Sequence, residues 1–426
     1  MREKRKIVVV YDKGAASPGE IFKGISRLGR VVFAVRESEY VARIMPVLQR
    51  LAEVVVIDES DLAASANTLR STGASAILTF SERMLGITAQ LASELGLLFH
   101  SPEVVELLQN KSLQRERLAQ SGTDVVPCRR ISDLGDWYSA VDEIGFPMVL
   151  KPIKGEGSRN TFKIDDFDSG HQIVQKLLAE RSVSVSKYFL VSEKFLQGVD
   201  TCKISDYVSV ESVIVRGAVT HIAVTGKFPL LPPFRETGQF WPTDLDHAEC
   251  LPVTELASRA IEALGLESGL THTEIKLTES GPKIIEINGR IGGWINELSL
   301  RALGIDLIEV AARIAMGLEI DLHLPEMDKV YFQASNLAPL RKGVLEEVVG
   351  ESVVRELPNI SSYRLVLRPG AKLMGGVNTE EIDLLCGETK DHASMLEVLD
   401  TALNAIGFRF SFSGESVTLT GSELWS

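Results

Sequence analysis

The stretch HTEIKLTESGPKIIEINGRIGG, at 272–293, holds the residues whose types and spacing best suit a chemical role. It reads as two strands joined by a tight turn at 279–281. Such a turn places Glu274 opposite Glu286, and side-chain alternation points Asn288 the same way as Glu286. Two carboxylates and an amide oxygen suit Mg²⁺, which keeps some waters and shares other positions with nucleotide phosphates.

A solvated hairpin with scattered charge is the plain alternative for this stretch. Its isoleucines indicate instead a largely buried hairpin, in which carboxylates need a partner. They are Ile275, Ile284, Ile285 and Ile287. His272 shares a strand face with Glu274, and we interpret it as a hydrogen-bonded structural histidine.

Two lysines and a glycine loop provide candidate phosphate contacts. Lys111 begins a probable helix and Lys151 ends a strand, so together they could neutralise successive phosphates. The loop KGEGSRN at 154–160 joins two strands, which suits a flap whose backbone N–H groups approach phosphates. Taken alone, each feature is more often a surface lysine or an ordinary turn.

A connector and a strand could contact the adenine and the ribose of a nucleotide. VSEKFL at 191–196 could present main-chain groups to an adenine edge, with Phe195 and Leu196 near the base. An edge strand is the alternative. In the alternating strand at 205–219, Glu211 could bind ribose or simply be solvated.

The loop LLPPFRETGQFWP at 230–242 is interpreted as substrate-facing, although such residues also occur in structural loops. Arg235 is a candidate for a substrate carboxylate and Glu236 for an ammonium group. Trp294 could narrow a substrate pocket, and core packing of the next helix is an equal alternative. It follows a glycine pair, so the free N–H groups of that helix would favour a carboxylate or phosphate.

Several elements must position these residues, and their order predicts a multidomain α/β and α+β protein. Short apolar runs alternate with helical stretches before residue 100, which predicts a Rossmann-like parallel sheet. Its strand candidates are 7–11, 31–35, 54–58 and 76–80. We divide the chain into an N-terminal domain at 1–105, a helical linker at 106–124, a lid at 125–195, a catalytic subdomain at 196–330 and a C-terminal α+β module at 331–426, with its last long helix at 391–406.

GAASPG at 14–19 begins like a phosphate-binding loop, but Glu20 and Ile21 stand where Lys and Ser or Thr are required. A P-loop or a dinucleotide fingerprint is therefore not expected.

Bulk composition narrows the class of protein. A net charge of −13 without a basic block disfavours nucleic acid as a partner. The four cysteines, Cys128, Cys202, Cys250 and Cys386, are widely spaced and predict the reduced thiols of a cytoplasmic protein. Charged residues interrupt the apolar stretch at 307–320, so it predicts a helix and not a membrane span.

The order lysine helix, strand–Lys–Pro, glycine flap, E-K-F-L connector and E…E-x-N-x-R resembles the ATP-grasp superfamily, carboxylate–amine ligases in particular. The resemblance covers essentially the whole chain. HTEIKL…IIEINGRIGGW, with DYVSVES and TGKFPLLPPFRETGQFWP, looks most like the L-amino-acid ligases that make dipeptides. The resemblance implies an ATP-grasp architecture with an ATP lid, a central antiparallel-sheet catalytic domain and a C-terminal module.

The resemblance also implies roles for individual residues. Phosphates would be held by Lys111 and Lys151 and covered by Gly155, Gly157 and Ser158. Adenine would be framed by Glu193, Lys194, Phe195 and Leu196. Two Mg²⁺, or Mn²⁺ in their place, would be bound by Glu274, Glu286 and Asn288. The acyl substrate would meet Arg290, Gly292, Gly293 and Trp294.

One departure affects the ribose contact that this family makes. Family members commonly carry Glu after the connector's glycine, whereas Gly198 is followed here by Val199 and Asp200. Asp200 or Glu211 is therefore left as the candidate for ribose.

The implied reaction is ATP-dependent joining of one amino acid's carboxylate to another's amine through an acyl phosphate. Lys151 and Arg290 would act in catalysis, with charge neutralisation and alignment as the main task. The alternatives are a carboxylase-like or nucleotide-biosynthetic ligase of the same superfamily, and an inactive nucleotide-binding regulatory protein. The oligomeric state is left open, with a homodimer as one option.

Overall fold

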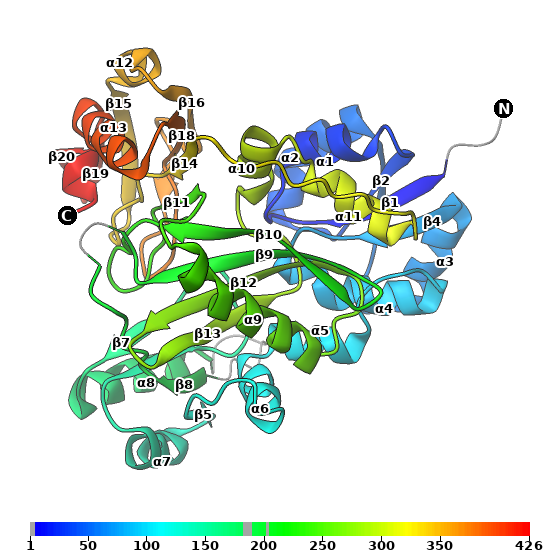
Figure 1. The fold of residues 1–426 in the computed structure, drawn as a ribbon, viewed down its shortest axis with the longest axis horizontal. Helices are drawn as coiled ribbons and strands as arrows, with labels where there is room; N and C mark the ends of the chain where they lie inside the picture. The colour runs from blue at the N-terminus through cyan, green and yellow to red at the C-terminus, as the bar shows by residue number, and fades with distance from the viewer. Residues whose placement is uncertain (1–4, 182–189, 202–203) are drawn as a thin grey trace.

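The computed structural model describes residues 5–181, 190–201 and 204–426, whose strands form four β-sheets. In Figure 1 the blue N-terminal domain lies beside a central green sheet, with the teal lid below and the orange and red C-terminal module at the upper left. The candidate site residues predicted from the sequence come from the helical linker, the lid and the central unit.

The N-terminal sheet is parallel, with strand order β3-β2-β1-β4, as the alternating pattern predicts. Both faces of β1 are buried: Ile7 and Val9 face one core, and Val8 and Val10 face another. This explains its unbroken apolar run. The strands are β1 (Lys6–Tyr11), β2 (Arg30–Val35), β3 (Glu53–Val56) and β4 (Ala74–Leu78), and the helices are α1 (Pro18–Ile25), α2 (Glu39–Leu51), α3 (Leu62–Thr72), η1 (Glu82–Met84) and α4 (Leu85–Leu95).

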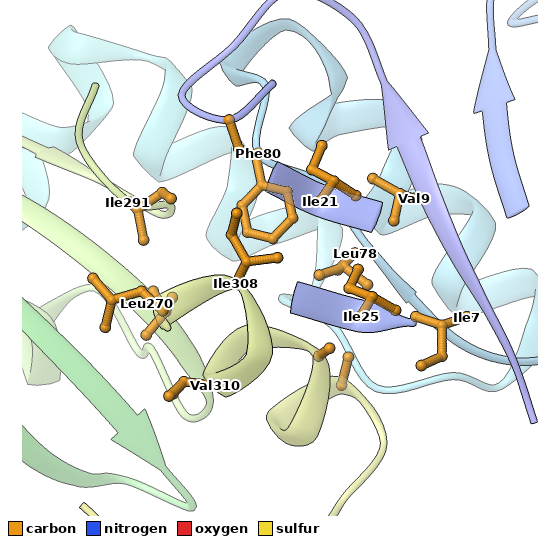
Figure 2. Packing of buried hydrophobic residues seen from close by; sticks show 14 of the residues in the cluster. Ile7, Val9, Ile21, Ile25, Leu78, Phe80, Leu270, Ile291, Ile308 and Val310 are labelled. Carbon is orange, nitrogen blue, oxygen red and sulfur yellow. The ribbon is translucent and has the colours of Figure 1, made fainter. Parts of the chain in front are cut away.

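A shared apolar core fixes this domain against the central unit. Ile21 and Ile25 of α1 lie beside Ile308 of α11 (Leu307–Ala315) in Figure 2. A Cβ on Gly24 would lie 2.9 Å from Ile308 Cγ2, so glycine permits this close approach of the two helices. The short helix η1, which carries Glu82, is anchored through Met84 in the other core of this domain.

The lid is a sheet of order β5-β8-β6-β7, joined to the N-terminal domain by two helices. The predicted linker is helical, because α5 and α6 occupy most of it. The bounds are α5 (Pro102–Gln109), α6 (Lys111–Gln120), β5 (Cys128–Ile131), α7 (Leu134–Ile144), β6 (Met148–Pro152), β7 (Phe162–Ile164), α8 (Phe167–Arg181) and β8 (Leu190–Lys194).

The central sheet has eight antiparallel strands in the order β13-β12-β9-β10-β11-β14-β18-β16. It continues across the predicted domain boundary at 330, because β14 pairs with β11 from Gly238↔Ala334 to Trp241↔Tyr331. The C-terminal module is therefore part of the sheet that carries the candidate site. The bounds are β9 (Tyr207–Val215), β10 (Ala218–Lys227), β11 (Gly238–Trp241), α9 (His247–Ala263), β12 (Gly269–Thr278), β13 (Gly281–Asn288), α10 (Ile295–Leu303), β14 (Val330–Ala334), β16 (Ile360–Leu365) and β18 (Asp383–Thr389).

The rest of the C-terminal module forms a small sheet of order β17-β15-β19-β20. Phenylalanines on β19, including Phe408 and Phe410, share one core with Phe332 of the central sheet. The predicted final long helix is confirmed as α13. The bounds are β15 (Gly343–Val349), α12 (Glu351–Glu356), β17 (Lys372–Leu373), α13 (His392–Ala405), β19 (Gly407–Phe412), β20 (Glu415–Thr420) and α14 (Gly421–Leu424).

Within the described residues, no helix has both the length and the apolar character that crossing a membrane requires. Cys128, Cys250 and Cys386 are free thiols, in agreement with the prediction, and Cys202 lies outside the described residues.

Candidate active site

A cavity of about 200 Å³ lies between the lid and the β12–β13 hairpin. Most of the predicted site residues line it: Lys111, Lys151, Gly155, Gly157, Ser158, Glu193, Phe195, Leu196, Glu236, Glu274, Glu286, Asn288 and Arg290. The other predicted residues do not line it: Lys194, Asp200, Glu211, Arg235, Gly292, Gly293 and Trp294.

The hairpin places the two predicted metal-binding carboxylates directly opposite each other. Glu274 pairs with Glu286, and His272 pairs with Asn288. The route to this register differs from the prediction, because the turn has two residues, Thr278 pairing with Gly281. A β-bulge then shifts the register between Glu274 and the next residue, which restores the predicted pairing.

Each predicted metal ligand has a cationic group or a histidine beside it. Lys111 Nζ lies 2.7 Å from Glu286 Oε1, and Arg290 Nη2 donates to Asn288 Oδ1 over 3.4 Å. His272 Nε2 lies 3.6 Å from Glu274 Oε1. These side chains balance the hairpin's negative charge.

The donor set fits a magnesium ion that is shared with phosphates. Among residues 5–181, 190–201 and 204–426, no group of three His, Cys, Asp or Glu side chains could hold a metal alone. Two carboxylates and one amide oxygen are hard ligands that leave room for phosphate oxygens and water. Glu274, Glu286 and Asn288 would therefore hold the ion together with a bound nucleotide.

Glu211 supports His272 and is not placed to contact a ribose, which corrects the predicted alternative. The Glu211 carboxylate is buried and accepts from His272 Nδ1 (2.8 Å), Ser209 Oγ (2.8 Å) and Thr225 Oγ1 (3.0 Å). Burial alone would lower the pKa of His272, but the Glu211 carboxylate outweighs burial and raises it to about 9. The resulting imidazolium overcomes the effect of burial on Glu274, lowering its pKa to about 2.

Glu193 forms a buried charge cluster and is not free to contact adenine through its side chain. Its carboxylate meets Arg115 at 3.1 Å and Lys151 at 2.8 Å. Burial would raise the pKa of Glu193, but these two cations lower it to about 2. Arg115 was missed by the sequence prediction. Its position one helical turn after Lys111 was the available signal, since residues four apart share a helix face.

Arg115 also connects the cluster to the hairpin. Its Nη1 donates to Ile284 O over 2.6 Å and its Nη2 to Ile285 O over 3.0 Å, at the bulge. The helix that begins at Lys111, the connector and the β12–β13 hairpin are therefore held together by one buried guanidinium.

The glycine loop is a flap between β6 and β7, as predicted, and it lies against two other segments. Gly157 and Ser158 have φ values of 63° and 53°, in the left-handed region that glycine adopts easily. Ser158 Oγ donates to Phe234 O over 2.6 Å. Gly157 O accepts from Thr379 N over 2.9 Å, and Asn160 N donates to Val377 O over 3.0 Å, so the flap contacts the C-terminal module.

Only part of the E-K-F-L connector faces the cavity. Phe195 and Leu196 line it, whereas the Lys194 ammonium lies 3.3 Å from Phe146 O, on the lid. Asp200 is exposed and lies outside the cavity wall, which gives the predicted ribose contact no geometric support.

Arg290 has a partner from the N-terminal domain that the sequence prediction missed. Its Nε lies 3.0 Å from Glu82 Oε2. Burial raises the pKa of Glu82 despite the nearby guanidinium. No local motif marks Glu82, because folding of a separate domain brings it to Arg290.

The two candidate residues of the loop at 230–242 differ in position: Arg235 braces the loop, and Glu236 lines the cavity. Arg235 donates to Pro232 O over 3.1 Å and to Ala338 O over 2.9 Å, so it braces the loop and is not directed at a substrate carboxylate. Glu236 lines the cavity and accepts from Tyr207 Oη over 2.8 Å.

Gly292 and Trp294 follow Arg290 and pack against other parts of the chain outside the cavity wall. A Cβ on Gly292 would lie 2.5 Å from His272 Nδ1, so this glycine is required by close approach. Trp294 is partly exposed with a left-handed φ of 60°, and the ring lies 4.4 Å from the Arg364 guanidinium. Its Nε1 donates to both oxygens of Glu381, at 2.9 and 3.0 Å. Glu381 belongs to the C-terminal module, and the sequence prediction missed it.

Comparison with known proteins places the site in a family context. Residues 144–297 match the family described as ATP-grasp domain. Alanine–anticapsin ligase of Bacillus subtilis (strain 168) is 28% identical over 305 residues, which cover 67% of this chain and 64% of that protein. Carnosine synthase 1 of Homo sapiens is 29% identical over 282 residues, which cover 61% of this chain and 33% of that protein. The chain thus spans less than two thirds of these relatives' lengths.

A solved structure resembles nearly the whole chain. The L-amino acid ligase from Bacillus licheniformis superimposes with a TM-score of 0.80 and 20% sequence identity. The superposition covers 97% of this chain and 100% of that one, so the likeness extends through the C-terminal module.

Proposed function

Because this chain has the ATP-grasp fold, with its ATP-grasp domain at residues 144–297, we propose that it is an ATP-dependent ligase of amino acids. It joins the carboxylate of one amino acid to the amine of another and releases ADP and phosphate. The observation that carries the proposal is the pairing of Glu274 with Glu286 inside a cavity that also contains Lys111, Lys151 and Arg290.

The charges on the cavity wall suit transfer of a phosphoryl group to a carboxylate. Magnesium, when bound at Glu274, Glu286 and Asn288, supplies charge neutralisation across the phosphates. Lys151 and Lys111 supply further positive charge from two different elements. Because each lysine is held by a carboxylate in this structure, nucleotide phosphates would compete with Glu193 and Glu286 for these ammonium groups.

Arg290 is placed to hold the carboxylate that becomes activated. Its guanidinium lies at the cavity wall beside Asn288, where a substrate carboxylate can approach the phosphate site. Once an amine attacks, the same guanidinium stabilises the oxyanion that forms. The flap excludes water, which would otherwise hydrolyse the acyl phosphate.

The relatives favour amino acids as substrates on both sides of the bond. The names of the B. subtilis and B. licheniformis proteins describe ligases of alanine and of amino acids, respectively. We extend to this chain the substrate class that these names share. Two magnesium ions and a cytoplasmic location are part of the same proposal, with a homodimer as one option for the assembly.

The test is amino-acid-dependent phosphate release, screened over pairs of amino acids, with mass spectrometry of the products. We expect a product whose mass equals the two amino acids minus water, formed with one ADP per bond. Hydrolysis of ATP without any condensed product, for every pair, would contradict the proposal.

A further inference from the structure

Trp294, four residues after Arg290 of the cavity wall, contacts a second region of the chain through its indole N–H. Trp294 comes from the central unit, and Glu381 from the segment that precedes β18. Lys13 of the N-terminal domain lies near enough to act electrostatically on Glu381. No step described so far uses this carboxylate.

Backbone hydrogen bonds connect the cavity-lining flap to the segment that precedes Glu381. Through Gly157 and Asn160 the flap backbone bonds to Thr379 and Val377, just before Glu381. Through Ser158 it bonds to Phe234, two residues before Glu236, which lines the cavity. The flap therefore contacts both the segment that precedes Glu381 and the loop at 230–242.

Glu381 is held by backbone pairing but keeps part of its surface open. Glu381 pairs with Leu337 as an isolated β-bridge, and the next residue is also held, because Ile382 N donates to Asn336 O over 2.8 Å. The residue is nevertheless partly exposed. A carboxylate on a fixed backbone, two residues after Thr379, which bonds to the cavity-lining flap, is a candidate to meet a ligand.

We propose that Glu381 is the catalytic base that takes the proton from the incoming amino group, so that the C-terminal module supplies the amine subsite. The inference rests on the proposed ligase function. Glu236, on the loop that the flap also holds, contributes a second negative charge for the ammonium group.

The chemistry requires such a base, because an amino acid is an ammonium ion near neutral pH and has no free electron pair. Glu381 accepts one proton from the ammonium, and the freed pair forms the C–N bond at the acyl carbon. The carbonyl pair moves to the oxygen, where Arg290 stabilises it. When that pair returns, the C–O bond to phosphate breaks, and phosphate leaves with the bonding electrons and takes up the second nitrogen proton. Glu381 then releases its proton to water.

The surroundings of Glu381 suit proton exchange near neutral pH. Burial raises the pKa of Glu381 to about 7, with help from the charges of Glu236 and Asp383, whereas Trp294 Nε1 and Lys13 act in the opposite direction. A base works best when its pKa is close to the working pH.

The decisive variant is Glu381→Gln, because the amide oxygen can still accept from Trp294 Nε1 while the base is lost. Hydroxylamine is largely unprotonated at neutral pH, so it traps the acyl phosphate as a hydroxamate without help from a base. We expect peptide formation to fall by about 10²–10⁴-fold while hydroxamate formation stays within about twofold of wild type. Raising the pH should rescue the variant, because more of the amine is then unprotonated.

Glu380→Gln is the matched control, since Glu380 is the neighbouring carboxylate and its pKa is likewise raised by burial. It should form peptide at the wild-type rate. Equal losses of peptide and hydroxamate in Glu381→Gln, or unchanged peptide formation, would overturn the role of Glu381. A wild-type enzyme that forms no hydroxamate with any amino acid would instead overturn the ligase function itself.

Discussion

The nucleotide side and the amine side of this site handle their carboxylates in opposite ways. On the nucleotide side, Glu193 and Glu274 face cations, and their pKa values fall to about 2. On the proposed amine side, burial raises the pKa of Glu381 to about 7, and the hydrogen bond from the neutral indole N–H of Trp294 offsets only part of that rise. The comparison teaches that one fold can hold carboxylates charged beside the proposed phosphate and metal site, and leave a proton exchangeable at the proposed amine subsite.

The largest expected effect comes from removing a metal ligand on the nucleotide side. Glu286→Gln should reduce amino-acid-dependent phosphate release by about 10³-fold or more, because a charged ligand opposite Glu274 is lost. Phosphate release at saturating ATP measures the effect. Glu279→Gln at the exposed hairpin tip is the control and should behave as wild type. Equal phosphate-release rates in the two variants would contradict the role of Glu286 as a metal ligand.

The next effect concerns stability, because Glu193 holds two buried cations. Glu193→Gln should lower the free energy of unfolding by about 3 kcal/mol at pH 7, since Arg115 and Lys151 lose their shared anion. The pKa of Glu193 is lowered from 4.5 to about 2, so its stabilisation is complete above pH 4.5 and is lost as the pH falls toward 2. Urea unfolding of both proteins across that range measures the difference.

Glu143→Gln is the control for this measurement. Glu143 pairs with Arg129 at the surface, with 56% of its side chain exposed, so its loss should cost at most about 1 kcal/mol. The account of the buried cluster would be contradicted if Glu193→Gln lost no more unfolding free energy than Glu143→Gln. It would also be contradicted if the loss in Glu193→Gln did not change below pH 4.5.

A smaller effect on ATP binding is expected for His272, which would act on the metal site through Glu274. His272→Asn should weaken magnesium-dependent ATP binding by about 10–100-fold, because Glu274 loses the group that orients it. Calorimetry with and without magnesium measures this directly. His221→Asn, a change at the histidine held between Ser212 and Ser258, is the control. Wild-type affinity in His272→Asn would show that Glu274 needs no such support.

The smallest effect separates Lys151 and Lys194, which lie on the paired lid strands β6 and β8. Lys194→Met should change the KM for ATP by no more than about twofold, because its ammonium lies against lid carbonyls and not in the cavity. Lys151→Met should raise the KM strongly, since Lys151 lines the cavity. A similar rise in both variants would mean that the connector moves when nucleotide binds.

The same contrast explains what could be predicted from the sequence. The hairpin, the flap and the lysine strand depend on local spacing, and their elements form where that spacing predicts them. The pairing of Glu274 with Glu286 was right although the turn is shorter than predicted, because the bulge compensates. Bulges depend on the partner strand and leave little trace in one sequence.

The remaining residues could not be found because folding alone brings them together. Glu82 reaches Arg290 and Glu381 reaches Trp294 from segments about 300 residues apart, and neither lies in a motif. Glu211 and Arg235 looked available for ligands, yet polar groups from neighbouring segments satisfy them. The continuous sheet across residue 330 was missed for the same reason, since β11 and β14 pair over a long separation.

The central claim is that the cavity activates a carboxylate by transferring a phosphoryl group to it. Its most direct test uses an amino acid labelled with ¹⁸O in the carboxylate, followed by mass spectrometry of the released phosphate. An acyl phosphate passes one carboxylate oxygen to phosphate, so each phosphate released with a peptide should carry one ¹⁸O. Unlabelled phosphate, formed while peptide accumulates, would contradict the claim.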